Sequence, residues 1–409
     1  MQFQKNSLKL AVALLCLLMV LIFGGQAWAY RVVHRFTLKD GNQPWAGLVA
    51  DAAGNFYGTT YWGGRYRWGS VFKLSPTPDG RWPESVIYSF GSDGINPCSP
   101  LILDDAGNLY GATFQGGAFG NGGTIFKLVP NPDGSWTHVL LYEFTDGVDG
   151  SAPESRLTFD SEGNLYGTAS RGGLGYGNGT IFKLAPNPDG SWTYTLIYSF
   201  NNRSDGFSPI GGLVFDTAGN LYGTANGQGM YTHGTIYKLT PDGNGEWTFS
   251  TIHQFTGGDD GSNPVASLVF DQSGNLYGTT SDWQGIAVGN GAVFQLQPLP
   301  DGKWRYRTLH YFTGGWDGKQ PFCDVVLDAA GNLYGTTRAG GDHGMGVVFK
   351  LIPTPEHPWK LEVLHHFWGG QDGNYPNAGL TWDGNGNLLG TTVYGGADNN
   401  RGVVFQLTP

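Results

Sequence analysis

Short apolar runs separated by polar, glycine-rich turns follow one another from residue 30 to the end of the chain. Between residues 153 and 200 the apolar runs are RLTFD, LYGTAS, TIFKL and TYTLIYSF, and the turns between them contain EGN, a glycine-rich loop and Asp-Gly. Short apolar runs bounded by Gly, Asn and Asp are typical of β-strands, and this region has no helical period. The pattern therefore predicts a four-stranded antiparallel meander.

The meander recurs along the chain at nearly constant intervals. The turn phrase G-N-[LF]-[YL]-G occurs seven times, 53 to 57 residues apart. Its asparagine stands at Asn55, Asn108, Asn164, Asn220, Asn275, Asn332 and Asn387. Four strands in about 55 residues are the unit of a propeller blade, so seven units predict seven blades.

The two ends of the repeat region predict how the ring closes. The last unit stops after its third strand, GVVFQL, whereas YRVVHRF, which starts at Tyr30, matches the fourth strand of other units. We therefore expect the N-terminal strand to complete the last blade, because this arrangement removes a free sheet edge. The predicted fold is an all-β, seven-bladed β-propeller of four-stranded antiparallel blades, formed by a single domain of residues 30–409.

Residues 1–29 do not belong to the repeat. Lys5 and Lys9 precede a continuous apolar stretch, and AWA ends at Ala29. A basic segment, an apolar segment and a small-residue site in this order indicate a secretory signal peptide, cleaved before Tyr30. An uncleaved anchor is the alternative, but the apolar run is short for a membrane span. We expect an exported protein, in the periplasm, at the cell surface or outside the cell, with no span in the mature chain.

Charge and cysteine content narrow the classes of partner. The net charge is −10, and the loss of Lys5 and Lys9 makes the mature chain more acidic. Nucleic acids and anionic membranes bind basic surfaces, so we expect neither as a partner. Cys98 and Cys323 are too few for a disulfide framework, and we expect both to be free thiols. We also expect no cofactor and a monomeric state.

The repeat unit resembles a known family. Its consensus, D-x-x-G-N-L-Y-G-T-x…G-G…G-T-[IV]-F-K-L, is similar to the GloVer (Gloeobacter/Verrucomicrobia) tandem repeat of exported bacterial proteins, over essentially all of residues 30–409. The resemblance implies a propeller-type repeat protein carried to the cell surface or beyond, often with a C-terminal anchoring signal. It implies no enzymatic activity. We identify no anchoring signal after GVVFQLTP, which leaves the mode of surface attachment open.

Two sets of aspartates recur once in each unit. The first set precedes G-N and is expected to accept hydrogen bonds from its own turn. It comprises Asp51, Asp104, Asp160, Asp216, Asp271, Asp328 and Asp383. The second set lies in D-G-x-x-P loops between blades, where we favour a structural role over calcium binding, because one carboxylate per blade supplies too few oxygens. It comprises Asp40, Asp93, Asp149, Asp205, Asp260, Asp317 and Asp372.

Histidines give little indication of catalysis. His34, His253, His310 and His365 occupy positions where other units have tyrosine, so we interpret them as packing residues with a polar tip. His343 lies beside Asp342 in a glycine-rich loop and is the exception. No HExxH, GxSxG, P-loop or CxxC motif is present.

Tryptophan is distributed unevenly among the loops. In the mature chain, six tryptophans lie outside the strands and outside the hairpins between third and fourth strands: Trp45, Trp62, Trp68, Trp283, Trp316 and Trp368. They belong to units 5, 6, 7 and 1, which are neighbours in a closed ring, and their loops are expected on one face. Clustered aromatic surface usually marks an interaction site, although these indoles could instead seal neighbouring loops.

We therefore hypothesise a non-catalytic binding protein of the cell surface or exterior, with a glycan as the first candidate ligand. The predicted binding surface consists of the six tryptophans together with Tyr394, Asp342 and His343. One alternative is a polysaccharide-active lyase or hydrolase that uses paired loop carboxylates such as Asp317, Asp342 and Asp372. Another alternative is a structural or adhesion module that binds a surface protein.

Overall fold

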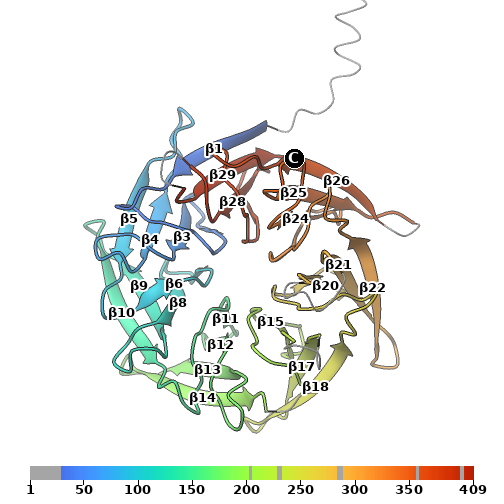
Figure 1. The fold of residues 1–409 in the computed structure, drawn as a ribbon. Helices are drawn as coiled ribbons and strands as arrows, with labels where there is room; N and C mark the ends of the chain where they lie inside the picture. The colour runs from blue at the N-terminus through green and yellow to red at the C-terminus, as the bar shows by residue number, and fades with distance from the viewer. Residues whose placement is uncertain (1–28, 202–204, 228–232, 283–288, 356–358, 397–399) are drawn as a thin grey trace, which may run out of the picture.

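Seven antiparallel sheets form a closed ring in the computed structural model (Figure 1). The structure describes residues 29–409 except 202–204, 228–232, 283–288, 356–358 and 397–399. The predicted signal peptide therefore lies, apart from its last residue, outside the described residues. No helix occurs in the described part of the chain, and the predicted seven-bladed β-propeller is confirmed.

In blades 1 to 6 the strands follow the chain from the inside of the ring to its outside, whereas β1 is the outermost strand of blade 7 (Figure 1). Blade 1 consists of β2 (Val49–Ala50), β3 (Phe56–Thr60), β4 (Ser70–Leu74) and β5 (Glu84–Ser89). Blade 2 consists of β6 (Ile95–Pro97), β7 (Ile102–Leu103), β8 (Leu109–Gln115), β9 (Thr124–Pro130) and β10 (Trp136–Glu143). Blade 3 consists of β11 (Thr158–Phe159), β12 (Leu165–Ala169), β13 (Thr180–Pro186) and β14 (Trp192–Ser199). Blades 4 and 5 consist of β15 (Val214–Phe215), β16 (Leu221–Ala225), β17 (Thr235–Pro241) and β18 (Trp247–Gln254); and β19 (Val269–Phe270), β20 (Leu276–Thr280), β21 (Ala292–Pro298) and β22 (Trp304–Tyr311). Blades 6 and 7 consist of β23 (Val326–Leu327), β24 (Leu333–Thr337), β25 (Val347–Ile352) and β26 (Lys360–His366); and β27 (Thr381–Trp382), β28 (Leu388–Thr392), β29 (Val403–Thr408) and β1 (Ala29–Arg35).

The N-terminal strand closes the ring as the sequence predicts. β1 pairs antiparallel with β29, from Ala29 opposite Thr408 to Arg35 opposite Val403. The Tyr30 hydroxyl also donates a hydrogen bond to the Asp372 carbonyl at 2.6 Å. The first and last residues of the propeller are therefore held in one sheet, and β29 has no free edge.

The innermost strands are shorter than the sequence predicts. In blade 3 the pattern predicts a strand over residues 156–160, whereas β11 contains only Thr158 and Phe159. Before this strand a side chain takes over the pairing, because the Ser155 hydroxyl accepts the Thr168 N–H at 3.0 Å. The Cys323 thiol does the same for Thr336 in blade 6. The predicted length of the first strand is therefore wrong, because side chains and not backbone carbonyls accept the hydrogen bonds of β12 and β24 at these positions.

Apolar contacts between neighbouring blades form the core. Tyr57 and Val71 of blade 1 pack with Leu109 and Phe126 of blade 2, and equivalent clusters lie around the ring. Hydrogen bonds join the blades as well. The second-strand threonine of blade 4, Thr224, donates to the Ala266 carbonyl of blade 5 at 3.0 Å, and both residues are buried.

The first aspartate set has the structural role expected from the sequence. In blade 1, Asp51 accepts hydrogen bonds from the Ala53 and Asn55 N–H groups at 2.9 Å and from the Tyr57 hydroxyl at 2.9 Å. Gly54, at φ 80°, supplies the left-handed residue that this turn requires. The recurring phrase therefore encodes a turn that satisfies its own polar groups.

Candidate functional site

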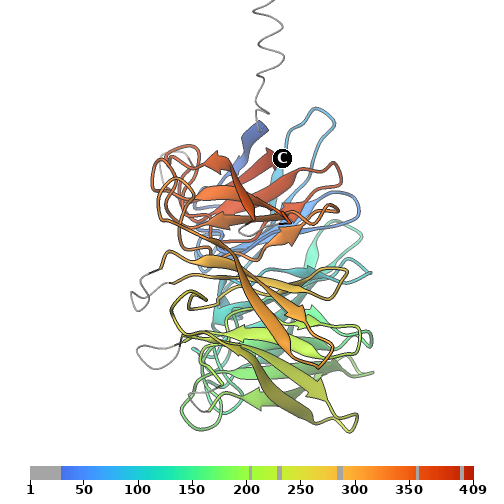
Figure 2. The same cartoon turned by 90° about the vertical axis from the view of Figure 1, so that its right-hand side faces the viewer.

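The inter-blade loops and the glycine-rich loops lie on the same face, as the sequence predicts. Backbone bridges join the two loop types within a unit, for example Asn42 with Trp62 and Asn374 with Tyr394. We call this side of the ring the loop face. Figure 2 shows the ring edge-on, with these loops on one side and the hairpins between third and fourth strands on the other.

The aspartates of the inter-blade loops contact groups of their own loop and of the preceding strand. Asp149 is buried, and its carboxylate accepts hydrogen bonds from the Tyr142 hydroxyl and the Thr145 N–H, both at 2.9 Å. Each aspartate of the second set likewise lies against the tyrosine or histidine of the preceding fourth strand: His34–Asp40, Tyr88–Asp93, Tyr142–Asp149, Tyr198–Asp205, His253–Asp260, His310–Asp317 and His365–Asp372. These contacts support the structural interpretation of both the aspartates and the histidines.

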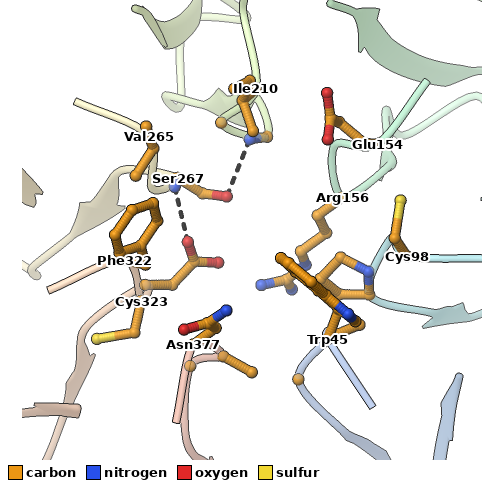
Figure 3. A pocket seen from close by; sticks show the side chains of 18 residues that line it. Trp45, Cys98, Glu154, Arg156, Ile210, Val265, Ser267, Phe322, Cys323 and Asn377 are labelled. Atoms are coloured by element: carbon orange, nitrogen blue, oxygen red, sulfur yellow. Dashed lines mark hydrogen bonds between the residues drawn. The ribbon is translucent and has the colours of Figure 1, made fainter. Parts of the chain in front are cut away.

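A cavity of about 290 Å³ opens where the seven inner strands meet (Figure 3). Most of its lining comes from the first and third residues after the proline of each D-G-x-x-P loop, because alternate side chains of an extended segment point to the same side. The first position contributes Trp45, Cys98, Glu154, Ile210, Val265, Phe322 and Asn377. The third position contributes Gly47, Pro100, Arg156, Gly212, Ser267, Asp324 and Gly379. We call this space the channel cavity.

Small residues at the third position are required by close packing. A Cβ added to Gly212 would lie 2.9 Å from the Arg156 carbonyl oxygen and 2.9 Å from the Ser267 hydroxyl. The neighbouring blades therefore approach one another closely at this level. Arg156 and Asp324, on blades 3 and 6, are the charged exceptions in this ring.

A hydrogen-bonded chain orients the acidic side of the channel cavity. The Gly212 N–H donates to the Ser267 hydroxyl at 3.0 Å, and the Ser267 N–H donates to Asp324 Oδ1 at 2.7 Å (Figure 3). Burial raises the pKa of Asp324, while the charge of Arg156 and the hydrogen bonds from Ser267 oppose this rise. The Asp324 carboxylate is thus held directly by Ser267 of blade 5, which is itself held by Gly212 of blade 4.

The second acid of the cavity is Glu154. Burial raises its pKa, and a hydrogen bond with Ser170 and the charge of Arg171 oppose the rise. The channel cavity therefore combines two carboxyl groups of elevated pKa with the guanidinium of Arg156, which is exposed in the cavity. Such a set of groups can accept hydrogen bonds from the hydroxyls of a polyhydroxylated ligand and donate hydrogen bonds to them.

Of the predicted tryptophans, Trp45 lies in this cavity. Its indole is 38% exposed, and its ring centre is 5.9 Å from that of Tyr61. Phe322 lines the cavity from blade 6 (Figure 3). The cavity therefore offers aromatic surface next to its charged groups.

Four other predicted tryptophans that the structure describes lie on the loop face outside the channel cavity. Trp62, Trp68, Trp316 and Trp368 are 39 to 57% exposed, and Trp283 falls outside the described residues. Trp68 lines a separate groove together with Tyr66. Exposed aromatic residues also occur in blades 2 and 3, at Phe119 and Tyr176, so aromatic exposure is not confined to one sector. A ligand-binding role for these residues stays a prediction.

The remaining predicted site residues have separate environments. Asp342 donates its N–H to His366 Nδ1 at 3.1 Å, and its carboxylate lies 3.8 Å from His366 Nε2. Its polar contact is therefore with His366, whereas His343 is an exposed neighbour. Tyr394 is partly buried, with its ring centre 5.8 Å from that of Tyr375.

The carboxylates suggested for an enzyme do not form an open pair. Asp317 is 1% exposed and Asp372 is 2% exposed, and each is bound by a histidine and by a backbone N–H of its own loop. The acids that do share a cavity, Glu154 and Asp324, were missed by the sequence analysis. A signal was present: aligned across the seven units, the residue after the loop proline is Trp, Cys, Glu, Ile, Val, Phe and Asn. Such variety beside an otherwise uniform phrase marks positions that folding does not constrain.

Cys98 and Cys323 are free cysteines, as expected, and both line the channel cavity. Burial raises the pKa of Cys98, and it raises the pKa of Cys323 to about 11. Both thiols are therefore protonated at neutral pH and are weak nucleophiles.

The fold and the cavity define a repeat-built β-propeller with a heterogeneous central site. The chain belongs to the Gloeobacter/Verrucomicrobia repeat family, whose model matches residues 24–225 and again residues 209–409. No curated protein sequence matches the chain.

Solved structures show the same fold at low sequence identity. PorZ, described as a bacterial surface component of the type-IX secretion system of Porphyromonas gingivalis, is 14% identical, with a TM-score of 0.53. The match covers 90% of this chain and 47% of PorZ, so this chain spans about half the length of that protein. A putative oxidoreductase (glucose dehydrogenase) from Thermus thermophilus is 15% identical over 93% of this chain and 99% of its own, with a TM-score of 0.45. A protein of unknown function from Dyadobacter fermentans is 11% identical over 93% and 98%, also with a TM-score of 0.45.

Proposed function

We propose that this protein is an exported carbohydrate-binding protein whose channel cavity holds one or two sugar units of a glycan. The observation that carries the proposal is the content of the cavity. Seven structurally equivalent positions place seven different side chains around it, including Trp45 and Asn377. A propeller built only for stability has no need of this variety, since the rest of the repeat is nearly uniform.

The chemistry of the cavity suits a sugar. An indole face stacks on the apolar face of a pyranose ring, while carboxylates, an amide and a guanidinium hydrogen-bond its hydroxyls. At about 290 Å³ the cavity lies near the lower end of ligand pockets, roughly 300 to 1,000 Å³, which suits a small unit rather than a long chain.

Export is the second part of the proposal. It is supported by the signal-peptide pattern of residues 1–29 and by the family's occurrence among exported proteins. The fold likeness to PorZ, itself described as a surface component, is consistent with it. Within the described residues, no helix has the length and apolar character needed to cross a membrane.

A glycan array of the mature chain first identifies candidate saccharides. Titration of the mature chain with the matching mono- and disaccharides, detected by intrinsic fluorescence or by calorimetry, then tests the proposal. We expect Trp45→Ala to weaken binding by roughly 10- to 100-fold, the usual cost of truncating an aromatic anchor. Trp62→Ala is the matched control, because Trp62 has nearly the same exposure on the same blade but lies outside the cavity. Equal losses in both variants, or no saccharide bound by the intact protein, would contradict the assignment.

A polysaccharide-active enzyme is the second candidate, because Glu154 and Asp324 are two carboxyl groups of raised pKa in one cavity. Such pairs are the usual machinery of glycoside hydrolysis. Release of reducing ends from polysaccharides, lost on Glu154→Gln, would favour this candidate over simple binding. Binding that is retained without any product favours the first proposal.

A further inference from the structure

The boundary between blades 7 and 1 differs in one position from the other boundaries. At most boundaries the fourth-strand tyrosine or histidine that contacts the loop aspartate is also stacked by a ring from the next blade. His253 stacks on Tyr306 with ring centres 4.2 Å apart, and Tyr142 stacks on Tyr194 at 4.5 Å. Blade 1 places Glu84 at the position that Tyr306 occupies in blade 5.

The substitution brings three metal-ligating side chains together. His34 lies on β1, Asp40 on the loop that follows, and Glu84 at the start of β5. One ligand atom of each lies within 4.8 Å of the other two, and His34 Nε2 is 3.2 Å from Asp40 Oδ2. Asp40 is already oriented, because its Oδ1 accepts the Thr37 N–H at 2.6 Å and the Thr37 hydroxyl at 2.9 Å.

Two atoms of this group are left without a hydrogen-bond partner among the described residues. His34 Nε2 and Glu84 Oε1 each expose less than 1 Å² to solvent and make no hydrogen bond of acceptable geometry. A buried, unpaired polar atom costs free energy, and a carboxylate oxygen costs most. Glu84 Oε1 therefore has no polar partner among the described residues, and a cation held between the three side chains would supply one.

We propose that His34, Asp40 and Glu84 bind one divalent transition-metal ion, with Zn²⁺ as the best match. One imidazole nitrogen and two carboxylate oxygens are ligands that Zn²⁺ accepts, with water in the fourth position. Tetrahedral bonds of about 2.0 Å put ligand atoms about 3.3 Å apart, close to the 3.2 Å between His34 Nε2 and Asp40 Oδ2. The ion ties the outer strands of blades 7 and 1 together beside the point where the ring closes.

The test uses the untagged mature protein, stripped with a chelator and titrated with Zn²⁺ by calorimetry, with Co²⁺ absorption as a second readout. We expect one ion per chain and a rise in Tm of about 3 °C or more at saturating Zn²⁺. Glu84→Gln should weaken Zn²⁺ binding at least tenfold and abolish the rise in Tm. His253→Tyr is the matched control, because it changes the equivalent histidine at a boundary that has Tyr306 in place of the glutamate.

A second variant guards against misfolding. His34→Tyr installs the residue found in blades 1, 2 and 3, and it should fold while losing the ion. No saturable binding at 1 mM Zn²⁺, or equal affinity in the intact protein and in His34→Tyr, would overturn the proposal.

Discussion

The third strand of each blade packs an aromatic ring against the glycine of the second strand. In blade 3 a Cβ on Gly167 would lie 2.6 Å from the Phe182 ring, so the glycine is required. Blade 4 has Tyr237 instead of phenylalanine, and its fully buried hydroxyl has no hydrogen-bond partner among the described residues. A single residue therefore carries a local cost that the other blades avoid.

Replacing Tyr237 with phenylalanine should raise the free energy of unfolding by about 1 kcal/mol, because an unsatisfied buried hydroxyl is removed. Urea denaturation of both proteins measures the change. The reverse replacement in blade 3, Phe182→Tyr, should lower the free energy of unfolding by about 1–3 kcal/mol. A loss of more than about 1 kcal/mol in Tyr237→Phe would show that the hydroxyl has a partner.

The histidines of the fourth strands predict a pH dependence. Burial lowers the pKa of His253 and His310, although Asp260 and Asp317 oppose this. The neutral ring is therefore favoured in the folded state, and the stability it contributes is present above the unfolded pKa, about 6.5. This stability is lost as the pH falls through the folded pKa.

Thermal melts between pH 7.5 and pH 5 test this prediction. The double variant His253→Tyr/His310→Tyr should fold normally, since tyrosine holds the same position in blades 1, 2 and 3, and it should lose less Tm on acidification than the intact protein. The turn aspartates act in a lower range. Hydrogen bonds hold the pKa of Asp51 below its ordinary value despite partial burial, so their contribution is lost only near and below about pH 4. Parallel melting curves for both proteins would count against the histidine effect.

At the scale of elements, inter-blade hydrogen bonds decide how firmly neighbouring sheets are joined. Thr224→Val keeps the shape of the side chain but leaves the buried Ala266 carbonyl without its 3.0 Å hydrogen bond. We expect a loss of about 1–3 kcal/mol in the free energy of unfolding, measured by urea denaturation. Thr251→Val on the exposed side of β18 is the control and should change it by less than about 0.5 kcal/mol. Equal effects would mean that blade packing alone holds the boundary.

Most strands follow from sequence pattern at this scale, and the exceptions have a physical cause. The second, third and fourth strands match their apolar runs, for example TIFKL within β13. The first strand does not, because residues on the channel side pair partly through side chains such as Ser155. Pattern analysis measures burial and turns, and it does not distinguish a backbone partner from a hydroxyl group.

For the whole molecule, ring closure depends on β1. Deletion of residues 30–37 should lower Tm by more than about 10 °C, because β29 loses its partner strand and Tyr30 no longer stacks on His365, 3.7 Å away. Metal-free conditions separate this effect from the loss of His34. Tyr30→Phe, which keeps the ring and removes the 2.6 Å hydrogen bond to Asp372, should cost only about 1 kcal/mol. A deletion variant that melts within about two degrees of the intact protein would contradict closure by β1.

The sequence alone determined the blade, the number of blades and the closure, because these depend on contacts that recur locally. Alternating apolar residues, turn aspartates and left-handed glycines act within a few positions, and each unit repeats them. It also indicated Trp45 as a candidate binding residue. It did not indicate Glu154, Arg156 or Asp324, which no motif connects.

Only the tertiary structure decided which side chains meet. Glu154 and Asp324 belong to blades 3 and 6, and they share a cavity because a closed ring turns every inner strand toward one axis. Glu84 reaches His34 because the N-terminal strand lies beside blade 1. Such contacts depend on the curvature and closure of the whole ring. A sequence pattern that is read over one blade at a time carries no information on either property.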